Sequence, residues 1–415
     1  MKSILIGFRI LISILILNFF AGKISAQWQQ MSAGITGGVN VTSFATGGSS
    51  IFAGTLGEGI YQTSNEGVSW STVNNGLTNL SVYSLGMSGN NIFAGTYSAG
   101  VFLSTNNGAL WISSNSGIEG NIFSFAVSGT SIYAAGNGGV FLSINNGASW
   151  TELLNGLPNS FSSTAVCISG TYVFAAENTT GTGGIYRSSD GGSNWTAAIN
   201  GLGTGSVHAL GASGTNIFAG TSSGIYMSAN QGNNWSPVNN GLPGLMYINT
   251  FGVSGTNVFT GTNPSGGIYL TTNNGANWID KNLGFSGPAY VYAITFAGNY
   301  IFAAKYHSVW RRAYSDIIGI KNLSSEIPGE YSLEQNYPNP FNPETKIIYK
   351  IKKSSFVSLR VYNSLGREVE SFVNIVQAPG TYEVTFDGKN YSSGTYFYKL
   401  DSKEYTETRR MVLIK

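Results

Sequence analysis

The chain has few of the residues on which most enzyme chemistry depends. Charged residues make up only 10% of its 415 positions, there is one cysteine, and His208 and His307 are the only histidines. A single cysteine excludes an internal disulfide framework, and we expect Cys167 to be a small buried filler. No carboxylate cluster stands beside either histidine in the sequence, so we expect no metal site and no cofactor. No basic stripe is present, which argues against a nucleic-acid partner.

Long apolar runs are also missing, with one exception near the N-terminus. Basic residues precede an apolar stretch from Ile10 to Phe20, and the small pair Ser25-Ala26 follows it. This pattern predicts a secretory signal peptide over residues 1–26. The apolar run is too short to span a bilayer comfortably, so we expect no transmembrane anchor. Because no cysteine follows the cleavage site, a lipoprotein is excluded.

The chain does contain a repeated eight-residue phrase, [Ser/Thr]-x-[Asn/Asp]-x-Gly-x-x-Trp. The phrase ends at six tryptophans, which are Trp70, Trp111, Trp150, Trp195, Trp235 and Trp278. The steps between them are 41, 39, 45, 40 and 43 residues. A period of about 40–45 residues is typical of one four-stranded blade of a β-propeller. Short β-rich runs between Gly, Asn and Ser clusters indicate antiparallel hairpins within each unit.

The units number seven by their inner strands. These strands begin near Asn40, Ser81, Asn121, Ser162, Ser206, Tyr247 and Tyr290. The seventh unit lacks the phrase and a clear fourth strand, but the segment that begins at Trp28 matches the one that begins at Trp70. We therefore expect the N-terminal strand to close the last blade, which removes exposed sheet edges. The prediction is an all-β fold with a seven-bladed propeller over residues 27–316, with six or eight blades as the alternatives.

The phrase resembles the Asp-box, the bacterial neuraminidase repeat. A carboxylate or amide at its third position can bond backbone N–H groups two residues on, its glycine tolerates a positive φ, and its tryptophan anchors packing between sheets. The third residues are Asn65, Asn106, Asn145, Asp190, Asn230 and Asn273, and the glycines are Gly67, Gly108, Gly147, Gly192, Gly232 and Gly275. In the Asp-box family the box is a structural turn that is usually remote from the active site. The resemblance therefore implies a structural role for these residues and for the six tryptophans.

The end of the chain differs in composition from the repeats. Residues 27–316 contain 8 acidic and 5 basic residues, whereas residues 317–415 contain 11 acidic and 13 basic ones. This change indicates a domain boundary, with a linker over residues 317–328 and a module over residues 329–415. Alternating strands in the module, separated by turn-bearing joints, predict an Ig-like β-sandwich at the C-terminus.

The module resembles the type A C-terminal sorting domain of the type IX secretion system. The resemblance rests on Asn336-Tyr-Pro-Asn-Pro-Phe-Asn-Pro, on Ser393-Gly-Thr-Tyr-Phe-Tyr and on the closing run Arg409-Arg-Met-Val-Leu-Ile-Lys. It implies a Gram-negative bacterium of the Bacteroidetes or their relatives, and export through the periplasm to the outer-membrane surface or the medium. It also implies that residues 329–415 contact the secretion machinery. In that family the module is usually removed, and the cargo is attached to the surface or released.

Catalytic groups are sparse in the propeller. Asp-box propellers include sialidases, xyloglucanases and receptors, so the fold alone does not decide the function. A sialidase needs an arginine cluster, but the propeller has only Arg187, Arg311 and Arg312, and the last two would diverge on a strand. Glycoside hydrolysis needs two opposed carboxylates. Glu58 and Glu177 fall in loops on the face opposite the boxes but form no pattern, so we expect no catalytic residue.

One ring of positions is a candidate binding surface. The third residues of the inner strands are Thr42, Tyr83, Phe123, Thr164, His208, Asn249 and Tyr292. They vary between aromatic and polar, whereas the residue two positions later is apolar in every strand. Variable aromatic and polar residues at the mouth of a central channel favour recognition, although the ring could instead plug the channel. The candidate ligand-binding residues are Tyr83, Phe123, His208, Asn249 and Tyr292, with Tyr97 and Tyr306 from the adjoining loops.

These observations predict a secreted or cell-surface monomer that acts as a non-catalytic binding or adhesion propeller. Glycans or surface polymers are the favoured ligands, because aromatic faces stack on sugars. A glycoside hydrolase that uses loop carboxylates and a structural scaffold of the cell envelope are the alternatives.

Overall fold

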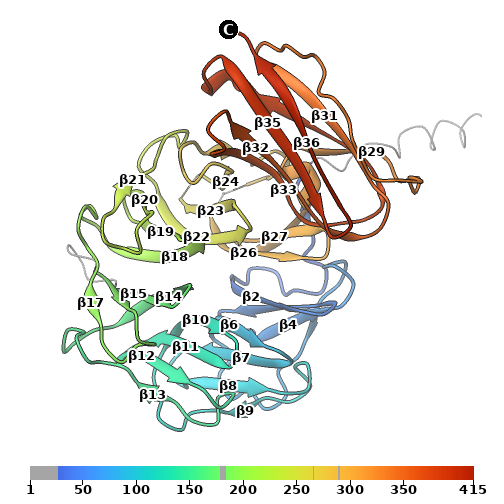
Figure 1. Cartoon of the computed structure of the whole chain (residues 1–415). Helices are drawn as coiled ribbons and strands as arrows, with labels where there is room; N and C mark the ends of the chain where they lie inside the picture. The colour runs from blue at the N-terminus through green and yellow to red at the C-terminus, as the bar shows by residue number, and fades with distance from the viewer. Residues whose placement is uncertain (1–26, 178–183, 265, 288–289) are drawn as a thin grey trace, which may run out of the picture.

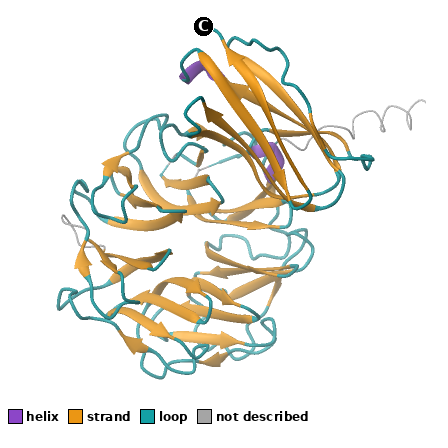
Figure 2. Cartoon of the chain, in the orientation of Figure 1, coloured by secondary structure: helices purple, strands orange, loops and turns teal. Residues whose placement is uncertain are grey.

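The computed structural model describes residues 27–177, 184–264, 266–287 and 290–415. The predicted signal peptide, residues 1–26, lies outside the described residues. Strands and loops make up nearly all of the described chain (Figure 2). The helical segments among the described residues are the short helix α2 (Tyr314–Ile317) and the 3-10 turn Gly388–Asn390. The prediction of an all-β chain is confirmed.

Residues 29–313, where described, form seven four-stranded antiparallel sheets, which we number one to seven in chain order. Their first strands are β2 (Val41–Gly47), β6 (Val82–Ser88), β10 (Ile122–Ser128), β14 (Ser163–Ser169), β18 (Val207–Ser213), β22 (Tyr247–Ser254) and β26 (Val291–Ala297). The second strands are β3 (Ser50–Thr55), β7 (Asn91–Thr96), β11 (Ser131–Gly136), β15 (Tyr172–Glu177), β19 (Asn216–Thr221), β23 (Asn257–Asn263) and β27 (Tyr300–Lys305). The third strands are β4 (Ile60–Thr63), β8 (Val101–Ser104), β12 (Gly139–Ser143), β16 (Ile185–Ser188), β20 (Gly224–Ser228), β24 (Ile268–Thr271) and β28 (Ser308–Ala313). The outer strands are β5 (Ser71–Thr72), β9 (Ile112–Ser113), β13 (Thr151–Glu152), β17 (Thr196–Ala197), β21 (Ser236–Pro237), β25 (Ile279–Asp280) and, for sheet seven, β1 (Gln29–Gln30).

The sheets form a closed ring, because each first strand contacts the first strands of both neighbouring sheets and β2 also contacts β26 (Figure 1). This is the arrangement of a β-propeller. β1 completes sheet seven by pairing with β28, with Gln29 opposite Arg311 and Gln30 opposite Trp310. The predicted closure of the last sheet by the N-terminal strand is therefore confirmed.

Aromatic side chains fill the space between neighbouring sheets. The third residue of each second strand is aromatic and buried, and these residues are Phe52, Phe93, Tyr133, Phe174, Phe218, Phe259 and Phe302. Phe93 shows the packing, because its ring meets Trp150 edge-on with centroids 6.2 Å apart. Cys167 is buried in the same layer, as predicted, and burial raises the pKa of its thiol to about 12, so it is not a reactive thiolate.

The C-terminal region contains two further four-stranded sheets among the described residues. One sheet orders its strands as β29 (Ile320–Ser324), β34 (Gly380–Asp387), β31 (Glu344–Ile351) and β30 (Ser332–Leu333). The other orders them as β33 (Glu368–Gln377), β32 (Ser355–Asn363), β35 (Gly394–Ser402) and β36 (Tyr405–Leu413). Apolar residues of both sheets, such as Ile347 and Val361, belong to one buried cluster.

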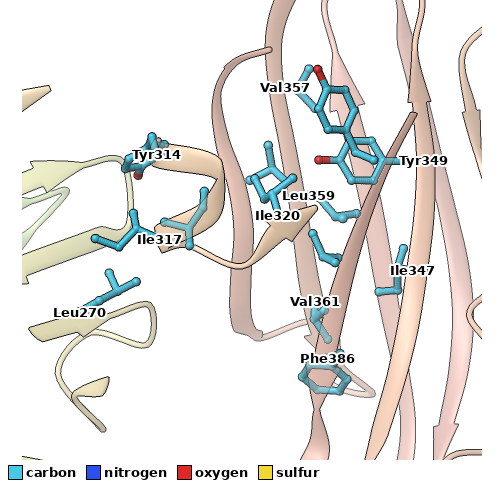
Figure 3. Packing of buried hydrophobic residues seen from close by; sticks show 14 of the residues in the cluster. Leu270, Tyr314, Ile317, Ile320, Ile347, Tyr349, Val357, Leu359, Val361 and Phe386 are labelled. Atoms are coloured by element: carbon cyan, nitrogen blue, oxygen red, sulfur yellow. The ribbon is translucent and has the colours of Figure 1, made fainter. Parts of the chain in front are cut away.

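The expected linker over residues 317–328 differs in the structure. Ile317 ends α2, and Ile320–Ser324 form β29, which pairs with β34. β29 lies at the sheet edge, so its polar residues face solvent while Ile320 is buried, and this polar composition resembled that of a loop. Tyr314, Ile317 and Ile320 connect the core of the propeller, at Leu270, to the core of the C-terminal sheets (Figure 3).

Candidate functional site

The repeated turns lie at the end of the ring where third strands lead into outer strands, which we call the box end. In sheet one, the Thr63 hydroxyl donates to Oδ1 of Asn65 (2.8 Å) and accepts from the N–H of Gly67 (3.1 Å). Oδ1 of Asn65 also accepts from the N–H of Ser69 (3.0 Å). Glu66 and Gly67 have positive φ angles of 57° and 82°, which folds the turn tightly around these acceptors.

The same network recurs in the other five turns. The hydroxyls of Ser104, Ser143, Ser188, Ser228 and Thr271 donate to the side chains of Asn106, Asn145, Asp190, Asn230 and Asn273 at 2.7–3.0 Å. Those side chains accept from the N–H four residues on at 2.9–3.0 Å. The predicted positive φ is confirmed for all six glycines. The predicted partner two residues on is wrong, because the left-handed residues bring the fourth N–H to the acceptor instead.

The tryptophans that end the turns connect each sheet to the preceding one. The indole N–H groups of Trp70, Trp111, Trp150, Trp235 and Trp278 donate to Met31, Val73, Ser114, Ala198 and Val238 carbonyls at 2.7–2.9 Å. Trp28 does the same to the carbonyl of Lys281 (2.7 Å), which extends the pattern to the N-terminal strand. The indole nitrogen of Trp195 is buried without a hydrogen-bond partner in the described structure. Side chains of the box turns are thus engaged in holding the sheets together.

The opposite end of the ring, where first strands begin and second strands end, is the mouth. The seven residues of the predicted ring lie there, and each one is a bulged residue at which the pairing of the first and second strands shifts register. A bulge re-aims one side chain out of the regular alternation. The alternation of apolar and polar residues could not reveal the bulges. Each bulge lies at the equivalent position of its first strand, which explains why these residues vary in type while the residues two positions later are apolar.

Three polar residues of this ring connect neighbouring sheets. Oγ1 of Thr42 donates to the carbonyl of Val82 (2.6 Å), and Oγ1 of Thr164 donates to that of Val207 (3.0 Å). The side-chain amide of Asn249, a predicted ligand-binding residue, donates to the carbonyl of Val291 (3.1 Å). This donor is therefore engaged within the propeller, a role that the sequence did not indicate.

Tyr83 and Phe123 come together with Tyr97 above sheets two and three. The Tyr83 ring lies 5.4 Å from that of Phe123 and 6.1 Å from that of Tyr97, measured between centroids. Tyr97 follows β7 directly and is half exposed, so this group presents an aromatic surface to solvent at the mouth.

His208 and Tyr247 form a second group between sheets five and six. Their rings stack with centroids 3.9 Å apart, and the Tyr247 hydroxyl lies 2.9 Å from Nδ1 of His208. Burial lowers the pKa of His208 to about 4, so the ring is neutral at pH 7. Nε2 of His208 is buried without a partner in the described structure.

Tyr292 and Tyr306 belong to a third group, which sheet seven forms with Tyr290 and His307. The Tyr306 ring lies 5.5 Å from Tyr290 and stacks on His307 at 3.8 Å. Burial and the neighbouring Tyr306 and Tyr290 hydroxyls raise the pKa of Tyr292. The predicted ligand-binding residues other than Asn249 thus form three separate groups around the mouth rather than one pocket.

The two loop carboxylates considered for catalysis, Glu58 and Glu177, belong to sheets that are not neighbours. Glu58 lies in the turn after β3 of sheet one, and Glu177 ends β15 of sheet four. Burial raises the pKa of Glu177, whereas Glu58 is exposed. Among the described residues no group of His, Cys, Asp and Glu is suited to hold a metal ion. In the same part of the chain, none of the helices has the length and apolar character needed to cross a membrane.

The C-terminal region docks at the box end. Oγ1 of Thr272, in the sixth turn, donates to Oε1 of Glu370 on β33, and Oε2 of Glu370 lies 2.8 Å from the hydroxyl of Tyr391. The Tyr314 hydroxyl accepts from the Asn257 amide (3.0 Å) at the same end. The sequence did not indicate these contacts, because they depend on how α2 positions the C-terminal region against the propeller. The mouth lies at the other end of the ring, and none of these contacts reaches it.

Comparisons with known proteins agree with this division. Residues 335–415 match the family of secretion system C-terminal sorting domains, and residues 117–257 match the DUF6242 beta propeller domain. No curated protein matches the chain significantly.

Several solved structures share the fold at low identity. The extracellular domain of the putative hybrid two-component system BT4673 from B. thetaiotaomicron is 13% identical, with a TM-score of 0.58 over 78% of this chain and 45% of that one. YCF48 from Cyanidioschyzon merolae is 14% identical over 69% of this chain and 98% of that one, with a TM-score of 0.53. The GH74 enzyme of Niastella koreensis is 19% identical over 66% of this chain and 43% of that one, with a TM-score of 0.50. The chain thus spans less than half of the first and third of these proteins, and the likeness concerns the fold alone.

These family matches confirm two of the sequence interpretations, the β-propeller and the C-terminal sorting domain. The chain joins a β-propeller to a C-terminal sorting domain of the type IX secretion system, and this domain directs the protein to the cell surface or outer membrane.

Proposed function

We propose that the protein is a non-catalytic recognition module of the cell surface, which binds glycans or surface polymers at the mouth of a seven-bladed Asp-box propeller. In this proposal residues 1–26 are a signal peptide, residues 27–316 form the propeller, and an Ig-like sandwich in residues 329–415, extended by β29, contacts the secretion machinery. One observation carries the proposal. The sorting domain occupies the box end, through Thr272 and Glu370, while aromatic residues such as Tyr97 and Tyr306 remain exposed at the free mouth.

The chemistry of the mouth supports recognition of sugars. Exposed aromatic rings supply faces on which pyranose rings stack, and side-chain amides and hydroxyls supply hydrogen bonds. Tyr83 and Phe123 support Tyr97 from the first strands, and His208 stacks on Tyr247. Tyr292 lies near Tyr306, and Asn249 bonds across the boundary between sheets six and seven. The protein then acts as a monomer, with its sorting domain held away from the ligand.

A glycan and polymer array with the purified full-length chain tests this proposal. Each spot is read first for bound protein and then for released sugar. Binding without release supports the recognition module and identifies the ligand class, and release of sugar contradicts it.

Glycoside hydrolysis is the second candidate, favoured by the raised pKa of the buried Glu177 carboxyl, as an acid catalyst requires. Replacing Glu177 with Gln would abolish sugar release in that case and would leave simple binding intact. If the array shows neither binding nor release, a structural scaffold of the cell envelope is the better account.

A further inference from the structure

The rim of the mouth is not uniform around the ring. The first residue after the second strand is Leu56 in sheet one, Tyr97 in sheet two and Tyr306 in sheet seven, which are 39%, 50% and 40% exposed. In sheets three and five the corresponding residues are Asn137 and Ser222, and in sheet six the equivalent position is Asn263, the last residue of β23. Sheets seven, one and two are neighbours in the ring, so these three residues lie along one arc.

Both tyrosines of this arc are held in place by other rings. Tyr97 meets Tyr83 edge-on, and Tyr306 packs between Tyr290 and His307. Ser98 and His307, the residues that follow them, have positive φ angles of 60° and 56°, which fixes the backbone in tight turns. Because neighbouring rings restrict the rotamers of Tyr97 and Tyr306, little side-chain entropy remains to be lost when a ligand stacks on them.

Hydrogen bonds also hold the part of the rim between Leu56 and Tyr97. The carbonyl of Leu80, itself 39% exposed, accepts from the N–H groups of Gly57 (3.1 Å) and Gly59 (2.8 Å) in the turn of sheet one. The amide of Asn79 donates to the carbonyl of Tyr97 (2.6 Å). The turns of sheets one and two are therefore joined at the rim rather than being separate loops.

The charge of the mouth limits which ligand it can take. The propeller sequence has five basic residues, all of them buried or half-buried, and Lys305 lies at the mouth end as the last residue of β27. Lys305 is buried, and its ammonium donates to the carbonyls of Ser286 and Gly287 beneath the rings of Phe285 and Trp310. Among the described propeller residues, no Lys or Arg is therefore exposed to pair with a carboxylate, sulfate or phosphate, whereas the Glu58 carboxylate is exposed on the arc. The surface disfavours anionic ligands.

From this geometry we propose that the arc over sheets seven, one and two binds one extended chain of a neutral glycan, with pyranose rings stacked on Tyr97 and Tyr306 and the chain crossing the turn at Leu56. This inference rests on the function proposed above. Packed sheets lie about 10 Å apart, so rings two sheets apart are separated by roughly 20 Å, the length of several sugar units. A monosaccharide therefore reaches only one of the two tyrosines.

Calorimetric titration of the full-length chain with cello-, xylo- and manno-oligosaccharides, from disaccharide to hexasaccharide, tests the inference. Polygalacturonate oligosaccharides and sialyllactose serve as anionic probes. We expect affinity for at least one neutral series to rise steeply with length, and Tyr97→Ala and Tyr306→Ala each to weaken hexasaccharide binding by about tenfold. Tyr337→Ala, at an exposed tyrosine of the sorting domain, is the matched control and should change nothing. Unchanged melting temperatures verify that the variants fold.

The alternative outcomes separate this inference from the function on which it rests. If a glycan binds the wild-type chain but both tyrosine variants bind it equally well, the arc is wrong and glycan recognition stands. Tighter binding of the anionic probes would overturn the neutral ligand class. Absence of binding to any probe, on the array as well as in titration, would contradict both.

Discussion

The hydroxyl of Tyr247 lies 2.9 Å from Nδ1 of His208, and the two rings stack across the boundary between sheets five and six. Neutral imidazole suits this site, because burial disfavours the imidazolium form and lowers the pKa of His208 from 6.5 to about 4. The pair therefore joins the two sheets at the mouth through ring stacking and one hydrogen bond. The described contacts of the His208 ring include no charged partner.

The pKa of His208 predicts a pH dependence of stability. A histidine whose folded pKa is lowered contributes stability that is complete above pH 6.5 and is lost as the pH falls through about 4. The His208→Phe variant keeps the stacking but cannot titrate. Between pH 7 and pH 4 we expect its free energy of unfolding to fall by about 1 kcal/mol less than that of the wild type. The difference is no larger because the His208 ring is only half buried. Thermal melts of both proteins between pH 7 and pH 4 measure the difference, and parallel curves would contradict it.

Glu370 predicts a pH dependence of the opposite sign at the domain interface. Burial raises the pKa of its carboxyl, so the folded state binds this proton more tightly and stability falls as the pH rises above the usual 4.5. The Tyr391 hydroxyl lies within hydrogen-bond distance of both the Glu370 carboxyl and the Val369 carbonyl, but it has only one proton to donate. When Glu370 is protonated, it donates to the Tyr391 oxygen, and the Tyr391 hydroxyl donates to the Val369 carbonyl. We expect Glu370→Gln to raise the free energy of unfolding at pH 8 by about 1–2 kcal/mol.

The neighbouring Glu368 offers a matched control for that prediction. It lies on the same strand but is more exposed and pairs with Arg360 at 3.6 Å. A surface pair of this kind contributes about 0–1 kcal/mol, so Glu368→Gln should be neutral or slightly destabilising at pH 8. Equal stabilisation by both variants would show that net charge, rather than burial of Glu370, is responsible.

The sequence predicted those features that repeat along the chain. The tryptophan phrase recurs at blade spacing, so it indicated the propeller, and Trp28 indicated closure by the N-terminal strand because its context copies that of Trp70. Features that leave no pattern in the residues escaped prediction. The residues of β29, Ile-Lys-Asn-Leu-Ser, show no alternation of apolar and polar side chains, so the sequence predicts a linker there. The inter-sheet bond of Asn249 depends on a bulge, and a bulge leaves no mark in the residue alternation.

Closure by Trp28 is testable by substitution. Its side chain is buried, stacks on Phe285 with centroids 4.6 Å apart, and donates to the Lys281 carbonyl. We expect Trp28→Ala to cost about 3–5 kcal/mol, as for other buried aromatic truncations, and deletion of residues 27–34 to lower the melting temperature at least as much. Gln30→Ala, at an exposed position of the same strand, is the control. A melting temperature unaffected by the deletion would show that β1 does not contribute to the stability of sheet seven.

The box turns predict a contrast between two glycines with similar backbone strain. Gly147 and Gly129 have φ angles of 81° and 60°, so alanine is strained at both positions. A Cβ at Gly147 would lie 2.6 Å from Cε1 of Phe93 and 2.9 Å from Oγ of Ser114, whereas a Cβ at Gly129 meets nothing within 4 Å. Gly129→Ala should therefore cost about 1 kcal/mol from the backbone alone, and Gly147→Ala should cost about 1–3 kcal/mol more, because the aromatic layer between sheets must move. Urea unfolding of the two variants measures the difference. Equal costs would mean that the box turn tolerates added volume and that the glycine is required only for its backbone angles.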